Sequence, residues 1–555
     1  MSEFLGSALI LLAIFMVAQF LILTKHLLKW LFLWQNKEYR LDKMRDYLSL
    51  PESKKVIFDI WTVLHIINVC LFIAKFTLKN IEVDTIYNFG VLYIILICTE
   101  ATFFLFKIFS GRKILKPKFT PKTIVLCLIS CFTVFVVSLT NQPLIVSVIV
   151  IFMPFIVGFS ILLTYPIDYF FKNRLFHKAL SQRRRLDKLK VVAISGAFGK
   201  TTTKEILATL LSKRYNVEKT QKNENTGVSC AKKMISLDSE SDYFLCEIGA
   251  YKKGEGTEIC NFIQPSASII TGLNHQHFSL FGSVENIILA ESESVNFLKP
   301  GESVIINWSS KLCRKIQIPK NLKVIKCGID NGETEERECD YFVKNIKSNE
   351  NGTEFDLVLK HSNSNEVFDG VDLRIPNVKT NLLSTGNIEN ILLCLAFCVE
   401  NGFKIDEIIP LLQNLSSPAG RLEKHDKEWG SVIYNQYNNT DGVRNALELI
   451  QDFNNNKIVI VDDIMELGKE SAYAHQKMAD QIINSKPSLV ILLGKSFYKT
   501  IEDQIRNSNS EFEILHWNGK NTTEIKQQIR KNIEVSKKKT TLLLLGFQSK
   551  NFLNI

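Results

Sequence analysis

Apolar residues are distributed very unevenly along this chain of 555 residues. Five apolar stretches, near 5–24, 56–77, 86–108, 123–140 and 143–165, are each long enough for a helix that crosses a bilayer, which takes about 20 residues. From residue 190 onward, short apolar runs alternate with charged and Asn-rich stretches, as in a soluble α/β protein. The pattern therefore predicts a multi-span α-helical membrane domain followed by α/β domains.

Lysine and arginine gather on alternate connections between these stretches. Segments 36–55 and 109–122 are basic and a basic run follows residue 171, whereas 78–85 holds one lysine with two acids and 141–142 is uncharged. The positive-inside rule then predicts a multi-pass protein of the cytoplasmic membrane, with its amino terminus outside and its large carboxy-terminal part in the cytoplasm. The first stretch is expected to be a retained helix, because its n-region lacks positive charge and no small-residue cleavage site follows.

The net charge of +10 changes this picture little, because much of the basic excess lies beside the apolar stretches. There it fits a topology signal or contact with anionic lipid. Since the soluble part has no basic module interleaved with aromatic residues, we expect the lipid bilayer, and no nucleic acid, as a partner. The twelve cysteines are scattered without a CxxC pair, which argues against a zinc site or a disulfide framework.

Three ionisable residues, Asp59, His65 and Glu100, lie in or near the apolar stretches. An ionisable group at membrane depth is a functional hypothesis by default. The plainer interpretation is an interfacial position for Asp59 and interhelical hydrogen bonds for His65 and Glu100.

A strand, a glycine turn and a helix follow one another at the start of the soluble part, in KVVAIS, GAFGKTTTKE and ILATLLSKRY. Such a turn presents backbone N–H groups and a helix amino terminus to an anion. We therefore predict that ATP phosphates bind there, with Lys200 on the β- and γ-phosphates and the Thr201 hydroxyl on Mg²⁺. The residues assigned to this loop are Gly196, Ala197, Phe198, Gly199, Lys200, Thr201 and Thr202.

The loop has the shorter GxxGKTT spacing, with Ile194 where the longer form has its first glycine, and this form resembles that of the Mur ligase family. The later stretches FLCEIGAYKKGE and SIITGLNHQHFSLFGSVENIILAESE match the family in order, most closely its D-alanyl-D-alanine-adding branch. The resemblance implies that Glu247 and His277 bind magnesium. The plain alternatives are a solvated acid at a strand end and an ordinary polar histidine.

Glu291 is the most informative departure from the family pattern, in which this helix usually carries a carbamylated lysine that helps to hold a second magnesium. We hypothesise that the encoded carboxylate replaces the modified lysine, because Mg²⁺ prefers oxygen ligands. The alternatives are a solvated helix acid or loss of the second metal.

Further matches concern the nucleotide. NLLSTGNIENILL resembles the family's adenine-packing helix, with Asn387 and Asn390 in register but Gly386 where histidine is usual. Phe198 also stands where asparagine is common. After an SSPAG linker, the resemblance implies that Arg421 reaches the nucleotide from across the cleft.

The last third of the chain continues the resemblance. In VIYNQYNNTDG, Asn435 stands where the family has an aspartate that meets the ribose or the metal, so its role stays open. The matching residues beyond it are Tyr437, Asn438, Asn439, Asp463, Glu466, Leu467, Gly468 and His475. We expect a membrane domain over 1–171, a basic juxtamembrane linker over 172–189, an ATP-binding central domain with a parallel sheet over 190–415 and a Rossmann-like domain over 416–555.

Together these features predict an ATP-dependent ligase that activates a carboxylate as an acyl phosphate and joins it to an amine. Its expected catalytic residues are Lys200, Glu247, His277 and Glu291, with ATP and Mg²⁺ as cofactors. The apolar stretches occupy the place of the family's UDP-sugar-binding domain, which favours a membrane-held substrate such as a lipid-linked glycan or peptide of the cell envelope. The alternatives are a ligase that makes a γ-linked amino-acid polymer and an inactive nucleotide-binding scaffold.

Overall fold

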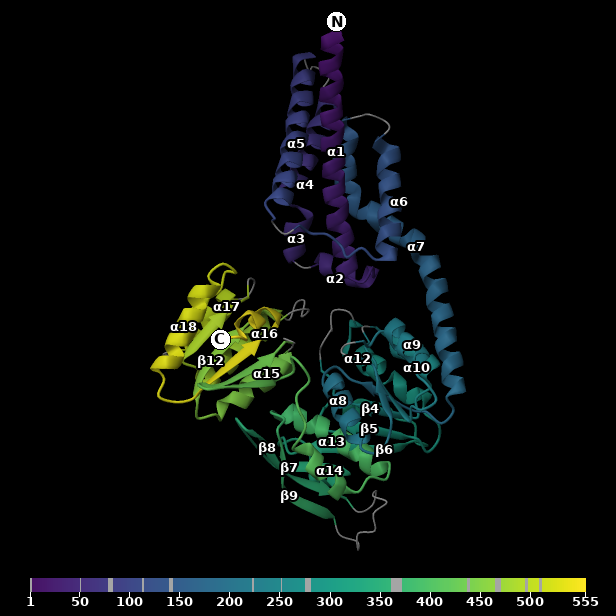
Figure 1. Cartoon of the computed structure of the whole chain (residues 1–555), viewed down its shortest axis with the longest axis vertical. Helices are drawn as coiled ribbons and strands as arrows, with labels where there is room; N and C mark the ends of the chain where they lie inside the picture. The colour runs from purple at the N-terminus through teal and green to yellow at the C-terminus, as the bar shows by residue number, and fades with distance from the viewer. Residues whose placement is uncertain are drawn as a thin grey trace. The chain divides into compact units, whose positions relative to one another are not determined.

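The chain forms two compact units, Met1–Asn173 and Arg174–Ile555, called here the helical unit and the α/β unit (Figure 1). Their architecture comes from a computed structural model. It describes residues 2–49, 51–77, 83–111, 114–138, 143–221, 224–250, 252–274, 281–360, 372–436, 440–464, 471–494, 498–508 and 512–555.

The described part of each predicted apolar stretch lies mostly in one helix of the helical unit, although 56–77 begins at the end of α3 and continues in α4. The helices are α1 (Ser2–Asn36), α2 (Leu41–Ser49), α3 (Pro51–Ile57), α4 (Ile60–Thr77), α5 (Val83–Phe109), α6 (Pro121–Ser138) and α7 (Pro143–Arg185). Three of them hold described segments long and apolar enough to cross a membrane, Ala13–Asn36, Val91–Phe109 and Ile145–Arg185. The described apolar parts of α4 and α6 are shorter, so the five-span topology stays a prediction.

The helices α1 and α7 are longer than the apolar stretches that predicted them. Because α7 continues to Arg185, most of the segment expected as a linker, 172–189, is helical. Hydropathy marks only the apolar part of a helix, whereas the backbone hydrogen bonds continue into polar residues that favour helix equally well. Most buried residues of the unit are apolar, among them Ile22, Leu31 and Ile97.

The first sheet of the α/β unit has nine strands in the order β2-β3-β1-β4-β5-β6-β7-β8-β9. Their bounds are β1 (Lys190–Ser195), β2 (Val217–Lys219), β3 (Tyr243–Glu247), β4 (Ala267–Ile270), β5 (Ser303–Asn307), β6 (Lys323–Ile329), β7 (Tyr341–Asn349), β8 (Gly352–Leu359) and β9 (Leu373–Thr380). The strands from β2 to β7 pair in parallel, which confirms the expected parallel sheet.

Two antiparallel strands, β8 and β9, extend this sheet beyond β7. They were not predicted, although Asn351 and Gly352 between two alternating segments are typical of a hairpin turn. One face of the sheet packs against α8 (Lys200–Leu211) and α13 (Thr385–Glu400), and the other against α9 (Gly227–Ile235) and α10 (Glu255–Ile263). Strand β1 is therefore buried on both faces, as parallel strands usually are.

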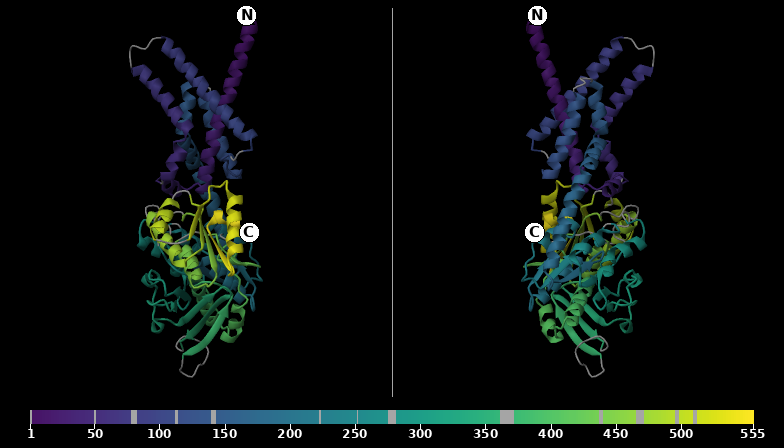
Figure 2. Two further views of the ribbon diagram at one scale, coloured as in Figure 1. Left: turned by 90° about the vertical axis from the view of Figure 1, so that its left-hand side faces the viewer. Right: turned by 90° about the vertical axis from the view of Figure 1, so that its right-hand side faces the viewer.

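The second sheet has six strands in the order β10-β11-β15-β12-β13-β14, of which β10 is an antiparallel edge. Figure 2 draws this part of the chain in light green to yellow. The strands are β10 (Glu423–Lys427), β11 (Gly430–Asn435), β12 (Asn456–Val461), β13 (Leu489–Leu492), β14 (Glu513–His516) and β15 (Thr540–Leu545). Helices α15 (Thr440–Gln451), α16 (Ser471–Ser485) and α17 (Tyr498–Asn507) cover one face, and α18 (Thr522–Val535) the other. This covered parallel sheet agrees with the predicted Rossmann-like domain.

Candidate functional site

The predicted phosphate loop lies between the end of β1 and the first residue of α8. Gly196 and Gly199 have φ angles of 133° and 80°, which favour glycine. A Cβ atom on Gly196 would lie 2.3 Å from Thr271 Oγ1, and one on Gly199 would lie 2.4 Å from Asn390 Oδ1. The loop therefore needs glycine at both positions for its backbone and for its close neighbours.

Lys200 opens α8, and its ammonium group donates a hydrogen bond to the carbonyl oxygen of Gly196. The charge therefore lies against the loop, and the helix amino terminus points its free N–H groups to the same end. Three positive features, the ammonium, the loop N–H groups and the helix dipole, converge on one place. Such an arrangement favours a polyphosphate.

Glu247 ends β3, which pairs with β1 so that Glu247 lies beside Ile194. Its side chain is buried, and its two oxygens lie 3.1 and 3.0 Å from the Thr201 hydroxyl. Lys204 Nζ, which is fully buried, donates to the same carboxylate at 3.1 Å, and Asn225 Nδ2 does so at 3.2 Å. Glu247 is thus no solvated strand-end acid.

Thr201 and Glu247 provide adjacent oxygen atoms at the carboxyl end of a parallel sheet, where α/β proteins bind ligands. A hydroxyl and a carboxylate are the hard donors that Mg²⁺ takes from proteins, and they face the place where the loop receives phosphates. The donor set therefore fits the predicted magnesium ion.

Glu291 is the last residue of α12 (Val284–Glu291), and its side chain is only 3% exposed. Its Oε2 accepts hydrogen bonds from Ser195 Oγ at 2.7 Å and from the Gly196 N–H at 2.9 Å. This burial excludes the solvated-acid alternative. The carboxylate supports the start of the phosphate loop.

His277 lies outside the described residues, and so do Tyr437, Asn438, Asn439, Glu466, Leu467 and Gly468. Their predicted roles stay predictions.

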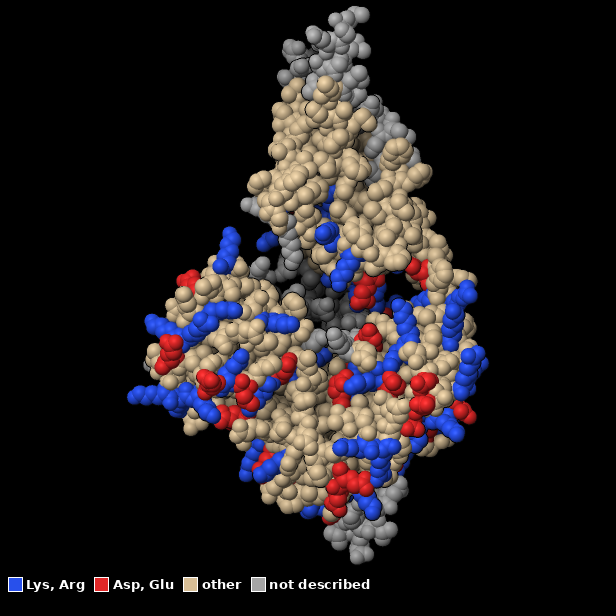
Figure 3. Space-filling view, viewed as in Figure 1, with Lys and Arg blue, Asp and Glu red and all other residues tan. Residues whose placement is uncertain are grey.

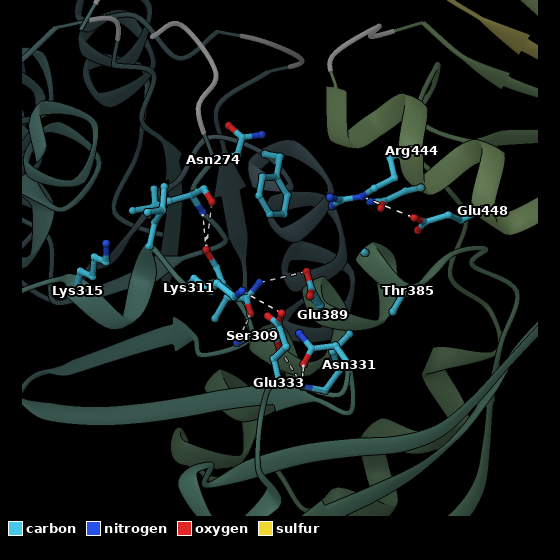
Figure 4. A pocket seen from close by; sticks show the side chains of 18 of the residues that line it. Asn274, Ser309, Lys311, Lys315, Asn331, Glu333, Thr385, Glu389, Arg444 and Glu448 are labelled. Carbon is cyan, nitrogen blue, oxygen red and sulfur yellow. Dashed lines mark hydrogen bonds and ion pairs between the residues drawn. The ribbon is translucent and has the colours of Figure 1, made fainter. Parts of the chain in front are cut away.

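A pocket of about 1010 Å³ lies next to the loop and includes the side chain of Phe198 (Figure 4). Asn307, at the end of β5, donates to the Thr271 carbonyl at 2.8 Å and to Glu389 Oε2 at 3.1 Å. On another side of the pocket, Arg444 and Glu448 of α15 reach it from the second sheet's domain. Its size suits a nucleoside, since ligand pockets commonly measure about 300–1,000 Å³.

Helix α13 contributes to this pocket through residues other than those predicted. Asn390 is buried, its Oδ1 accepts from Thr203 Oγ1 at 3.1 Å, and it packs under Gly199 of the loop. Asn387 donates to the Leu383 carbonyl at 2.6 Å. The α13 residues along the pocket are Thr385, Gly386 and Glu389.

A second pocket, of about 710 Å³, is lined by Thr201 and Arg421, and the predicted contact of Arg421 with the nucleotide stays a prediction. It also includes Lys219 and Gln436, beside the linker that leads into β10. Asn435, the last residue of β11, is buried and is not among the residues described as lining either pocket. The geometry thus groups Arg421, but not Asn435, with the phosphate loop.

His475, from the last matching motif, is buried on α16. Its Nε2 accepts a hydrogen bond from the Ile464 N–H at 2.9 Å, and its Nδ1 lies 2.6 Å from the Ser471 carbonyl oxygen. This pattern requires the neutral imidazole, and burial lowers the pKa of His475 accordingly. Burial also raises the pKa of Asp462, at the end of β12. His475 therefore holds the backbone at Ile464, just after β12.

Comparison with known proteins agrees with this geometry. The Mur ligase middle domain matches residues 194–398. A UDP-N-acetylmuramoyl-tripeptide–D-alanyl-D-alanine ligase of Buchnera aphidicola (strain APS) is 27% identical over 371 residues, which are 66% of this chain and 75% of that protein. The enzyme of the same name from Escherichia coli K12 is 26% identical over 55% of this chain and 65% of its own length.

Solved structures extend the agreement to the fold. A crystal structure of MurF from Acinetobacter baumannii has a TM-score of 0.59 at 21% identity, covering 69% of this chain and 80% of that chain. MurF ligase from Thermotoga maritima in complex with ADP gives a TM-score of 0.55 at 20% identity, over 69% and 82%. Residues 194–398 therefore match a Mur ligase middle domain, and the chain is similar to D-alanyl-D-alanine-adding ligases in sequence and to MurF in fold.

Proposed function

We propose that this ligase uses ATP and Mg²⁺ to convert a carboxylate into an acyl phosphate and joins it to an amine, on a cell-envelope substrate held at the membrane. The single observation that supports the chemistry best is the contact of the Thr201 hydroxyl with the buried Glu247 carboxylate beside Lys200 and the glycine loop.

A carboxylate is a poor acyl donor, because its leaving group would be an oxide. In the proposed reaction a carboxylate oxygen attacks the γ-phosphorus of ATP, and ADP leaves. The amine then attacks the acyl carbon, inorganic phosphate leaves, and the amine nitrogen loses a proton. Lys200 stabilises the negative charge on the transferred phosphoryl group, and the loop N–H groups hold the other phosphates.

Thr201 and Glu247 would hold magnesium, which when bound neutralises phosphate charge. His277 is proposed as a further ligand by resemblance. Glu291 is proposed to take the place of the family's modified lysine, and its buried carboxylate at Gly196 supports a role at the loop. Comparing Glu291→Gln with Glu291→Lys at varied bicarbonate tests this idea, and full activity of Glu291→Gln at every bicarbonate concentration would refute it.

We assign the adenosine part of ATP to the pocket beside Phe198. Asn307 and Glu389 present polar groups there, and the Phe198 ring offers an apolar face to a base. Because Arg444 reaches this pocket from the second sheet's domain, nucleotide binding would draw the two α/β domains together. Such closure keeps water away from an acyl phosphate.

The membrane part of the proposal rests on the surface of the helical unit. Large apolar side chains of α7 are exposed, among them Phe155 at 70% and Phe159 at 62%. On the face shown in Figure 3, charged side chains are sparse on this unit and dense on the α/β unit. An exposed apolar surface of this extent is stable in lipid and unfavourable in water.

The test uses the full-length chain in detergent with Mg²⁺. ADP formation is followed while candidate acids and amines are added singly and in pairs, and nucleotide binding is compared for wild type, Lys200→Ala and the exposed control Lys213→Ala. We expect ADP only when an acid and an amine are both present, and a loss of nucleotide binding in Lys200→Ala alone. Equal nucleotide binding by Lys200→Ala would refute the phosphate site.

The same assay separates the other candidates. Nucleotide binding without ADP formation from any acid and amine would favour an inactive nucleotide-binding scaffold, and long products from free glutamate would favour a γ-linked polymer ligase. Full-rate ligation of a soluble UDP-muramoyl peptide by the full-length chain would refute the membrane-held substrate.

A further inference from the structure

Three ionisable side chains from three different helices meet inside the helical unit. They are His26 of α1, His65 of α4 and Glu100 of α5, and each has 0% of its surface exposed. His26 Nε2 lies 2.9 Å from Glu100 Oε1, and His65 Nε2 lies 2.9 Å from Glu100 Oε2. One nitrogen or oxygen atom from each side chain lies within 4.8 Å of the other two.

Two imidazole nitrogens and one carboxylate oxygen are a donor set for first-row divalent transition metals such as Zn²⁺, Co²⁺ or Fe²⁺. Such ions bind imidazole nitrogen at about 2.0–2.1 Å, which places neighbouring ligand atoms of a tetrahedral ion roughly 3.3 Å apart. The present separations, from 2.9 Å to within 4.8 Å, lie on both sides of that value, so small side-chain shifts would suffice. Mg²⁺ prefers oxygen donors, so this position differs in kind from the magnesium site proposed beside ATP.

The neighbours of His65 support the same interpretation. Its second ring nitrogen, Nδ1, lies 2.8 Å from Ser147 Oγ of α7, and Asn68 Nδ2 donates to that hydroxyl at 3.1 Å. Metal-binding histidines usually have their second nitrogen held in this way, which fixes the direction of the ring. The His26 and His65 rings stand at 80° to each other with centroids 6.2 Å apart, and both direct Nε2 at one carboxylate.

The negative charge of the Glu100 carboxylate is paired with the ammonium group of Lys25. Its ammonium group lies 2.6 Å from Glu100 Oε1, and its side chain is 15% exposed, whereas Glu100 is fully enclosed. A buried carboxylate must be paired with a cation, and Lys25 fills that role here. Lys25 Nζ also lies 5.1 Å from the centre of the Trp61 ring, which offers the ammonium another favourable neighbour.

We propose that the helical unit binds one divalent transition-metal ion through His26 Nε2, His65 Nε2 and the Glu100 carboxylate, in competition with Lys25 for that carboxylate. When the ion enters, the lysine leaves Glu100 for Trp61 or loses its proton. The bound ion joins α1, α4 and α5 at one point. The ion is chemically independent of the ligase reaction, so the proposal stands apart from the proposed function.

The test uses the full-length chain in detergent after treatment with a chelator. Co²⁺ is titrated, its visible absorption is recorded, and bound metal per chain is measured by elemental analysis. We expect one ion per chain with absorption typical of mixed nitrogen and oxygen ligands. His26→Gln and Glu100→Gln should weaken Co²⁺ binding at least tenfold, while His177→Gln, which removes an exposed imidazole of α7, should leave it unchanged.

Lys25→Met provides a second, independent test. Because it removes the competing cation and keeps all three proposed ligands, it should tighten Co²⁺ binding several-fold and reduce the number of protons released on binding. ATP binding by each variant reports that the rest of the chain is folded. Co²⁺ binding that is the same in wild type, Glu100→Gln and Lys25→Met, or that is absent from the wild type, would overturn the proposal.

Discussion

Two buried carboxylates, Glu247 of the α/β unit and Glu100 of the helical unit, are held by similar partners in different settings. Glu247 is 2% exposed and meets a hydroxyl, a lysine and an amide. Glu100 is fully buried and meets a lysine and two imidazoles. In each place a buried negative charge is balanced by a lysine, as burial of an ion requires.

The difference lies in how the chain assembles the two groups. Parallel strands end at one edge of a sheet, so Glu247 of β3 meets Thr201 and Lys204 of α8, the helix that follows the neighbouring strand β1. These partners are 46 and 43 residues from Glu247, and the imidazole partners of Glu100, on α1 and α4, are 74 and 35 residues away. Sequence separation is therefore similar, but the edge of a parallel sheet is a known meeting place, whereas the second group depends on how the helices pack.

The largest effect that would test this comparison is expected from Glu247→Gln. The change removes the proposed magnesium ligand and the closest carboxylate of the fully buried Lys204, whose other acidic neighbour, Glu205, lies 3.8 Å away. We therefore expect ADP formation to fall by roughly a hundredfold or more. Glu218→Gln on β2, whose carboxylate pairs with Lys233 away from the loop, is the matched control. Near-normal ADP formation by Glu247→Gln would mean that Glu247 has a structural role and does not bind magnesium.

A second test concerns the shape of the phosphate loop. Gly199→Ala combines a positive φ with a close approach to Asn390, so we expect nucleotide affinity to fall by roughly tenfold or more. Gly519→Ala is the control, because its φ is also positive, at 84°, but nothing lies within 4 Å of the added atom. If both variants bind nucleotide equally well, the contact with Asn390 does not shape the loop.

The phosphate loop was predictable because all its signals lie within 22 residues of sequence. The β-branched run KVVAIS gave β1 with its bounds, and the glycine turn before Lys200 gave the start of α8. The pocket beside Phe198 was not predictable, since Asn307, Glu389 and Arg444 come from β5, α13 and α15. The one sequence signal for Asn307 was its position as a polar residue at the carboxyl end of the strand SVIIN.

The helical unit shows the same limit. Apolar length predicted helices over all five stretches, because a helix satisfies its own backbone in an apolar environment. It could not predict which polar groups would meet, since that depends on how the helices are rotated. Glu100 and His65 were expected to form interhelical hydrogen bonds, and they do so, but the contributions of Lys25 and His26 were missed.

A smaller effect is expected from the ion pair of Lys29 and Asp59, which joins α1 to the start of α4 at 2.7 Å. Lys29 also donates to the Val56 carbonyl at 2.6 Å, and its side chain is only 9% exposed. Asp59→Asn should therefore destabilise the helical unit by about 1–3 kcal/mol, because it leaves a largely buried ammonium partly paired. Thermal unfolding in detergent measures this loss.

The double variant Lys29→Met with Asp59→Asn should lose less stability than the sum of the single changes, since neither charge is then left alone. Glu38→Gln is the control. Glu38 pairs with Lys43, but its side chain is 52% exposed, and an exposed ion pair contributes little stability. Strictly additive losses in the double variant would show that Lys29 and Asp59 do not stabilise each other.

The smallest expected effect is a pH dependence of stability that comes from His475, a buried side chain that carries no charge in the folded protein. His475 accepts from one backbone N–H and binds one backbone carbonyl, and burial lowers its pKa below the ordinary value of about 6.5. The unfolded chain then binds more protons than the folded chain below that pH. Stability from this group is therefore complete above about pH 6.5 and is lost as the pH falls, by at most about 1.4 kcal/mol per pH unit.

His475→Gln should flatten the dependence of the unfolding temperature on pH between about 5 and 7, because glutamine keeps a donor and an acceptor but does not titrate in this range. The control His177→Gln, on an exposed stretch of α7, should keep the wild-type dependence. An unchanged pH profile in His475→Gln would assign the acid sensitivity to other groups. A flattened profile would show that His475 is buried as a neutral imidazole bonded to two backbone groups. The buried carboxylates Glu247 and Glu100 are instead each paired with a lysine.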